Sequence, residues 1–227
     1  MNRIAIIICA AAGSVANSQT PQRPVLDSSL SALVAKNIGY QERLVEALRN
    51  SARYSNAQRN SLADYLTTVA IQNRSGPFQQ GDSATYAAAA RAVTVLGHSS
   101  MREYPGMEPN LGGEPYAGAL DRLIRVAQNS PVDAIRERCL RVMLGAADRS
   151  RALEFVRSVA AGPDTSAAED AVRVLIEDAS GHTTIPHQTP AQRDQSLSVL
   201  RELAATHGVT SRSGSRQVDV WLRNRKP

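Results

Sequence analysis

Two histidines that lie five residues apart are the best candidates for metal chemistry in this sequence. His182 and His187 flank the segment Thr-Thr-Ile-Pro, and two imidazoles supply about half of the ligands that a zinc ion needs. No third ligand is adjacent, although Glu177 and Asp178 are near in sequence. Solvated loop histidines produce the same spacing far more often. We therefore expect no bound metal, with His182 and His187 as the weak candidate ligands.

The segment 98–114 gathers a second set of polar side chains that could bind a ligand. It shows no clear helical period, and segments of this length inside a helical array are typically functional loops or disordered connections. Carboxylates at Glu103, Glu108 and Glu114 suit a cation or a basic partner, and Tyr104 lies among them. We take Glu103, Tyr104 and Glu108 as candidate binding residues. A solvated linker between two groups of helices is the simpler alternative.

Cys139 is a candidate nucleophile, because a thiolate attacks readily when a nearby base lowers the thiol pKa. Its position argues against this role. Cys139 shares a helical stripe with Ile135, Val142 and Met143, which predicts a small buried core residue. The sequence also lacks the motifs of serine hydrolases, zinc proteases, P-loop enzymes and dinucleotide-binding enzymes. We expect no catalytic residue among these motifs and no cofactor.

Helices must position these side chains, because apolar residues recur every three or four positions beyond residue 26. Side chains suited to helix N-caps stand at Asp27, Ser55, Asp148 and Thr189. Strand-like alternation is nearly absent. The pattern predicts an all-α protein of about ten helices. Short turns between them make consecutive helices antiparallel neighbours.

Glycine and proline residues set further expected helix boundaries. The alanine-rich helix that opens near Asp82 is expected to end at Gly97. Pro115 and Pro131 are expected at the first position of their helices, where a missing N–H costs no hydrogen bond. The last helix is expected to begin at Ser215.

Part of the chain repeats itself with a shift of 32 residues. In this alignment Arg141 corresponds to Arg173, and Cys139 corresponds to Ala171. One unit is an outer helix, a tight turn and an inner helix. If both arginines face outward, they form a short ladder that an acidic partner can use. Arg141 and Arg173 are therefore candidate binding residues.

The first copy carries an apolar-arginine pair, an apolar pair and an acid at the turn, namely Ile135-Arg136, Val142-Met143 and Asp148. Over residues 116–180 this pattern resembles the short bacterial HEAT-like repeat. It departs from that family in the second copy, where Ala167-Ala168 stands in place of a Val-Arg pair. The resemblance implies antiparallel helical hairpins stacked as a short α-solenoid. Such arrays present an extended concave surface to a partner.

The N-terminus has the pattern of a secretory signal peptide. Arg3 precedes a short apolar run that ends in small residues, and this run is too short to span a bilayer. We expect export to the periplasm or the medium, with no membrane insertion after cleavage. The expected organisation is a signal peptide, a linker, N-terminal hairpins, an irregular loop and HEAT-like repeats, over residues 1–18, 19–26, 27–97, 98–114 and 115–227.

Composition excludes several function classes. The chain has 227 residues, a net charge of +5, and only 4% aromatic residues. Its arginines alternate with acids instead of clustering, so we expect no nucleic-acid binding. The sequence predicts an exported interaction protein that binds a protein or peptide without catalysis. The alternative is an envelope hydrolase whose site is formed by the loops at 98–114 and 181–188, and convergence of their histidines and glutamates would favour it.

Overall fold

The computed structural model describes residues 24–36, 41–77, 83–102, 113–182 and 188–225, and all regular elements within these ranges are helices. The predicted all-α fold is confirmed. The helices are α1 (Ser28–Lys36), α2 (Gln41–Arg49), α3 (Asn56–Gln72), α4 (Ser83–Ser100), α5 (Ala119–Asn129), α6 (Asp133–Met143), α7 (Arg149–Ala160), α8 (Thr165–Ser180), α9 (Pro190–Ala205) and α10 (Arg212–Asn224).

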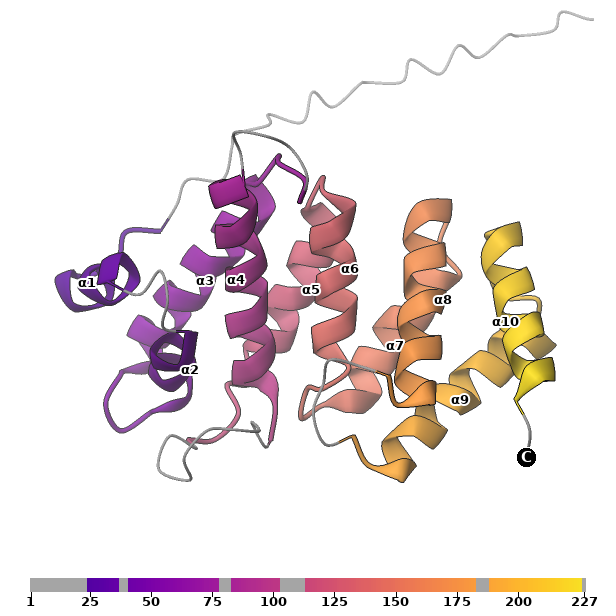
Figure 1. The fold of residues 1–227 in the computed structure, drawn as a ribbon. Helices are drawn as coiled ribbons and strands as arrows, with labels where there is room; N and C mark the ends of the chain where they lie inside the picture. The colour runs from indigo at the N-terminus through magenta and orange to yellow at the C-terminus, as the bar shows by residue number, and fades with distance from the viewer. Residues whose placement is uncertain (1–23, 37–40, 78–82, 103–112, 183–187, 226–227) are drawn as a thin grey trace, which may run out of the picture.

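The helices form two layers (Figure 1). In one layer α2, α4, α6, α8 and α10 follow one another, and each packs against the next. The odd-numbered helices form the other layer, in which α3 packs against α5 and α7 against α9. Apolar side chains from both layers form one hydrophobic core that extends from Leu30 to Val218. The even-numbered layer is therefore the more continuous of the two.

Several predicted helix starts are confirmed by their capping contacts. Ser55 and Thr189 each form a capping box, in which the hydroxyl accepts a backbone N–H and a glutamine side chain returns the bond. Asp148 caps α7 by accepting the N–H of Arg151. Pro190 stands at the start of α9, where its missing N–H is not needed.

Two proline positions were predicted wrongly. Helix α6 begins at Asp133, two residues after Pro131, because Ser130 ends α5 by donating its N–H to Val126. Helix α5 begins at Ala119 and not at Pro115. The N–H of Tyr116 donates to Ser99 O over 2.8 Å, which holds this stretch against the end of α4 before the helix can start.

Two other predicted boundaries were also wrong. Helix α10 begins at Arg212, because Ser211 accepts the N–H of Gly214 and caps the helix earlier than Ser215. Helix α4 continues past Gly97 to Ser100. Gly97 marks a close helix crossing instead of an end: a Cβ at this position would lie 2.7 Å from Val142 Cβ of α6.

Two buried arginines link segments that are distant in sequence. Arg49, at the end of α2, donates from Nε to Gly113 O at 2.9 Å and from Nη1 to Met101 O at 3.0 Å. It also donates from Nη2 to Arg102 O at 3.1 Å. The guanidinium thus holds the chain on both sides of the segment 103–112, and burial lowers its pKa.

Arg149, the first residue of α7, links α7 to α8 and α9 in a similar way. Its Nη2 lies 2.5 Å from Asp178 Oδ2, and the side chains of Arg149 and Asp178 are 8% and 0% exposed. Ser196 donates to the same carboxylate oxygen, while Arg149 also donates to Gln192 O and Gln195 Oε1. Each helix contributes a polar group, so the network fixes how the three helices meet.

Replacing Gly97 by alanine tests the crossing of α4 and α6. Alanine favours a helix interior over glycine by about 1 kcal/mol, so a position without contacts would become more stable. Contact with Val142 reverses the sign, and we expect a net loss of about 1–2 kcal/mol from overpacking. Thermal unfolding measures the change. Gly76→Ala is the comparison variant, because Gly76 lies outside the helices and a Cβ there meets nothing within 4 Å.

Arg149→Ala tests the buried ion pair. The variant leaves Asp178 buried without its cation, so we expect a loss of about 3–5 kcal/mol in the free energy of unfolding. Arg151→Ala removes an exposed ion pair with Asp121 and should cost no more than about 1 kcal/mol. Urea denaturation compares the two variants. Equal losses would contradict the role given to Arg149.

Candidate binding groove between α4 and α6

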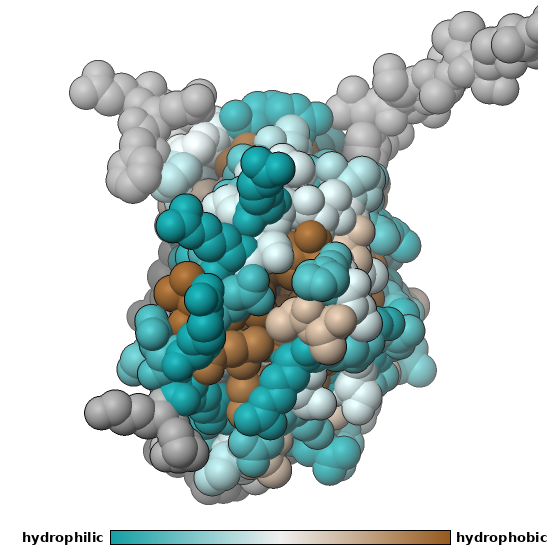
Figure 2. All heavy atoms as spheres, turned by 90° about the vertical axis from the view of Figure 1, so that its right-hand side faces the viewer, coloured by the Kyte–Doolittle hydropathy of each residue, from teal (hydrophilic) through white to brown (hydrophobic). Residues whose placement is uncertain are grey.

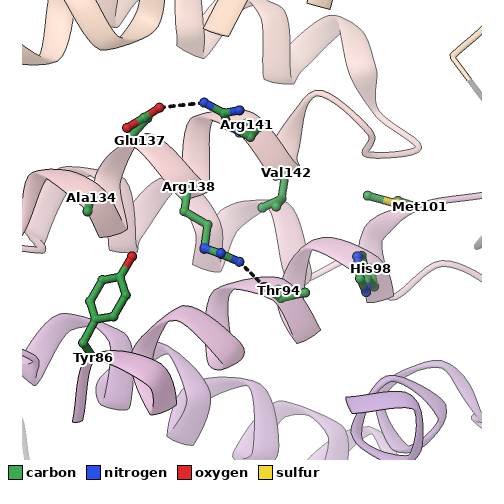
Figure 3. A pocket seen from close by; sticks show the side chains of 9 residues that line it. All are labelled: Tyr86, Thr94, His98, Met101, Ala134, Glu137, Arg138, Arg141 and Val142. Carbon is green, nitrogen blue, oxygen red and sulfur yellow. Dashed lines mark hydrogen bonds and ion pairs between the residues drawn. The ribbon is translucent and has the colours of Figure 1, made fainter. Parts of the chain in front are cut away.

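A hollow of about 380 Å³ lies between α4 and α6 in the even-numbered layer (Figure 3). Its walls come from the facing sides of the two helices and the residue that follows α4. The lining residues are Tyr86, Thr94, His98, Met101, Ala134, Glu137, Arg138, Arg141 and Val142. The helices meet closely at Gly97 and Val142, and the small side chains of Thr94 and Ala134 leave room beside this contact.

Arg138 crosses the groove from α6 to α4. Its Nη1 donates to Thr94 Oγ1 at 2.9 Å, as the dashed line in Figure 3 marks. The side chain is exposed, and no carboxylate among the described residues pairs with it. A guanidinium carries five N–H donors, so one bond to Thr94 leaves donors for an anionic ligand. Arg138 is not predictable as a site residue from the sequence, because the neighbouring Glu137 indicates a balanced, solvated helix surface.

The two arginines predicted from the repeat do lie on helices that pack against each other, α6 and α8. Arg141 pairs with Glu137 at 2.6 Å and with Glu177 at 2.7 Å. Arg173 pairs with Glu137 at 3.1 Å and with Asp170 at 2.5 Å. Glu137 therefore bridges the two arginines. The pair forms part of a balanced ion network between α6 and α8 instead of a row of unpaired cations.

His98 lies in α4 and lines the groove, whereas the sequence predicted that it opens an irregular loop. Burial, together with the smaller effect of the nearby Arg138 charge, lowers the pKa of His98 to about 4. The imidazole is therefore neutral at pH 7. A neutral imidazole offers the groove a hydrogen-bonding ring with no added charge.

The remaining candidate residues are not brought together by the described parts of the structure. His182 is exposed just after α8, and α6 lies between α8 and the helix that carries His98. Glu103, Tyr104, Glu108 and His187 lie outside the described residues. Within the described ranges, no group of three or more His, Cys, Asp or Glu side chains could hold a metal ion.

Cys139 is fully buried, as its helical stripe predicted. Burial raises the pKa of the thiol, because a thiolate would lose its hydration. A protonated, inaccessible thiol is a poor nucleophile. Ala171, its counterpart in the repeat, is also fully buried, so both positions are core sites in helices that pack against each other.

Comparisons of this chain with known protein families, with curated proteins and with solved structures gave no match. Among the helices that the structure describes, none is both long and apolar enough to cross a bilayer.

The lowered pKa of His98 predicts a specific dependence of stability on pH. An unfolded histidine has a pKa near 6.5, so between about pH 6.5 and pH 4 the unfolded state binds more protons than the native state. The stability contributed by neutral His98 is present above pH 6.5 and is lost as the pH falls toward 4. Thermal melts at pH 7 and pH 5 should show a smaller drop for His98→Gln than for the wild type. Equal drops would contradict the burial of a neutral imidazole.

Proposed function

We propose that this chain is an exported protein of stacked, HEAT-like helical hairpins that binds an acidic, extended segment of another protein. The signal-peptide pattern at residues 1–18 supports export, and the 32-residue repeat supports the stacked arrangement. The binding surface is the layer of even-numbered helices. Its central contact is the groove between α4 and α6.

The packing of the two layers supports the choice of this surface. Every even-numbered helix from α2 to α10 packs against the next one, whereas α5 and α7 in the other layer do not pack closely. An array whose helices are closer together on one side curves toward that side. The even-numbered layer is then the concave one, and concave faces of helical repeats offer extended binding surfaces.

Arg138 is the observation that carries the proposal. It is an exposed guanidinium held across a groove by one hydrogen bond to Thr94, with no carboxylate partner among the described residues. Guanidinium groups bind carboxylates through two parallel hydrogen bonds, which give direction as well as strength. The phenol of Tyr86 and the neutral imidazole of His98 supply further polar contacts. Met101 and Val142 add apolar surface for a side chain of the partner.

The ion network beside the groove limits where an acidic partner can bind. Arg141 and Arg173 already face Glu137, Glu177 and Asp170, so they offer little net charge to a partner. Binding should therefore be centred on Arg138 and depend on that one side chain. A surface that attracted acids through its general charge would distribute the effect over many arginines.

A photo-crosslinking experiment in the native host tests this function. The photoreactive residue p-benzoylphenylalanine replaces Tyr86 in the groove, or Phe155 of α7 in the opposite layer as a matched aromatic position. We expect a discrete crosslinked product from position 86 and none of the same size from position 155. Crosslinking that is equal from both positions would contradict the choice of surface.

The charge reversal Arg138→Glu, added to the photoreactive chain, identifies the interaction responsible. It should reduce the product at position 86 by about tenfold or more, because it puts like charges together in the groove. Arg125→Glu is the matched control. Arg125 is an exposed arginine of α5 that pairs with no carboxylate of the described residues, and its reversal changes the net charge equally. If both variants reduced the crosslinked product equally, general charge attraction would explain the binding, and the proposal would be contradicted.

A further inference from the structure

The C-terminal end of the array has a second hollowed surface, which is separate from the α4–α6 groove. Helix α10 packs against α8 and α9 and buries Gly214 and Val218. A groove of about 460 Å³ runs between α8 and α10. It is lined mainly by apolar surface, with Ile176 on one side and Val220 and Trp221 on the other. This groove is suited to an apolar side chain of a ligand.

A smaller, more polar hollow of about 320 Å³ adjoins this groove, and Trp221 and Asn224 line both. Ser180 of α8, Arg193 of α9, and Asn224 and Arg225 at the end of α10 line it. Neither Arg193 nor Arg225 forms an ion pair with a carboxylate of the described residues. The Arg225 guanidinium lies 5.3 Å from the centre of the Trp221 ring, so the indole holds one of the two cations in place.

Apolar surface is exposed at this end of the molecule. Figure 2 views the array from the α10 end and shows hydrophobic residues at the surface, bordered by hydrophilic ones. Val220 is 42% exposed, which is high for a large apolar side chain in a helix that packs against the core. An apolar patch with a polar rim is typical of an interaction site.

The charges at this end favour an acidic ligand. Arg216 lines the apolar groove, and Arg193 and Arg225 line the polar hollow, whereas no acid among the described residues lines either of them. Along α10 the only carboxylate is Asp219, against arginines that include Arg212 and Arg223 as well. A ligand with carboxylates beside an apolar side chain therefore matches both hollows at once.

We propose that the α10 end is a second docking site that binds an acidic peptide segment of a partner protein. An apolar side chain of the segment enters the groove between Ile176 and Val220. A carboxylate of a neighbouring residue in the segment binds Arg193 and Arg225 in the polar hollow. Two adjoining hollows, one apolar and one polar, suit a peptide better than the flat surface of an anionic membrane. The site requires neither Arg138 nor the α4–α6 groove.

The single tryptophan of the chain makes the test specific to this site. Because Trp221 lines both hollows, its fluorescence emission reports their occupancy without a label. The probe is the capped peptide Ser-Glu-Glu-Leu-Glu-Phe-Glu-Ser, which contains no tryptophan, and the comparison peptide carries glutamine at every glutamate. We expect the acidic peptide to shift the Trp221 emission to shorter wavelength in a saturable manner, and the glutamine peptide to bind at least about tenfold more weakly.

Variants identify the groups that bind the peptide. Arg193→Gln with Arg225→Gln should weaken binding at least about tenfold, measured by the anisotropy of a fluorescein-labelled peptide so that changes near the indole do not interfere. Arg125→Gln with Arg201→Gln removes the same charge from exposed arginines outside both hollows and should change binding less than about twofold. Val220→Ser should weaken the acidic peptide without affecting its preference over the glutamine peptide. These anisotropy measurements are made in the Arg138→Glu background, so that binding at the α4–α6 groove does not contribute. Far-UV circular dichroism checks that each variant is folded.

Several outcomes would overturn the proposal. One is the absence of an emission shift with the acidic peptide, and another is equal binding of the two peptides. Equal weakening by the two double variants would indicate general attraction between opposite charges. Vesicles of phosphatidylglycerol and phosphatidylcholine are tested last. If they shift the Trp221 emission and the acidic peptide does not, the surface binds an anionic membrane instead of a peptide.

Discussion

The ion pair between Arg149 and Asp178 determines how the C-terminal half of the array is assembled. Helical hairpins bury apolar faces readily, but apolar contacts alone allow neighbouring helices to slide or rotate. A buried charge pair does not, because any displacement leaves two ions without solvent or partner. Asp178 accepts from Arg149 of α7 and Ser196 of α9, so three consecutive helices share one fixed point. The α8–α10 groove and its arginines keep their positions as a consequence.

The arginines of this chain differ in role according to their partners. Arg49 and Arg149 are buried and bind carbonyl or carboxylate oxygens inside the fold. Arg141 and Arg173 share Glu137 at the surface, where they join α6 to α8. Arg138 belongs to neither group, since it donates to the neutral hydroxyl of Thr94 and pairs with no carboxylate of the described residues. Charge composition alone does not distinguish these five arginines. Their hydrogen-bond and ion-pair partners do, because paired arginines hold the fold together and an arginine without a carboxylate partner can bind a ligand.

The sequence predicted the fold class and many helix ends, because both depend on local chemistry. Ser55, Asp148 and Thr189 cap their helices through neighbouring N–H groups, and the burial of Cys139 follows from the stripe on its own helix. Errors arose where contacts between distant segments decide the outcome. Gly97 was taken for a helix end, yet its lack of a side chain serves the contact with Val142, 45 positions along the chain.

The candidate site was less predictable than the fold for the same reason. Arg138 gains its significance from Thr94 on another helix, and the burial of Arg149 depends on Asp178 and Ser196. Arg141 and Arg173 were correctly assigned to corresponding positions, since the repeat is visible in the sequence. Their neutralisation was not foreseen, because Glu137 contacts Arg173 across the boundary between two helices.

The clamp formed by Arg49 makes the chain tolerant of insertion between residues 102 and 113. Its guanidinium binds backbone carbonyls of Met101, Arg102 and Gly113, a group that every residue provides. Only Gly113 has a required identity, since a Cβ there would collide with the Arg49 carbonyl oxygen. The two ends of the intervening segment are thus fixed through the main chain, whatever side chains lie between them. A foreign epitope or a longer recognition loop could be grafted at this point while the helices on either side keep their packing.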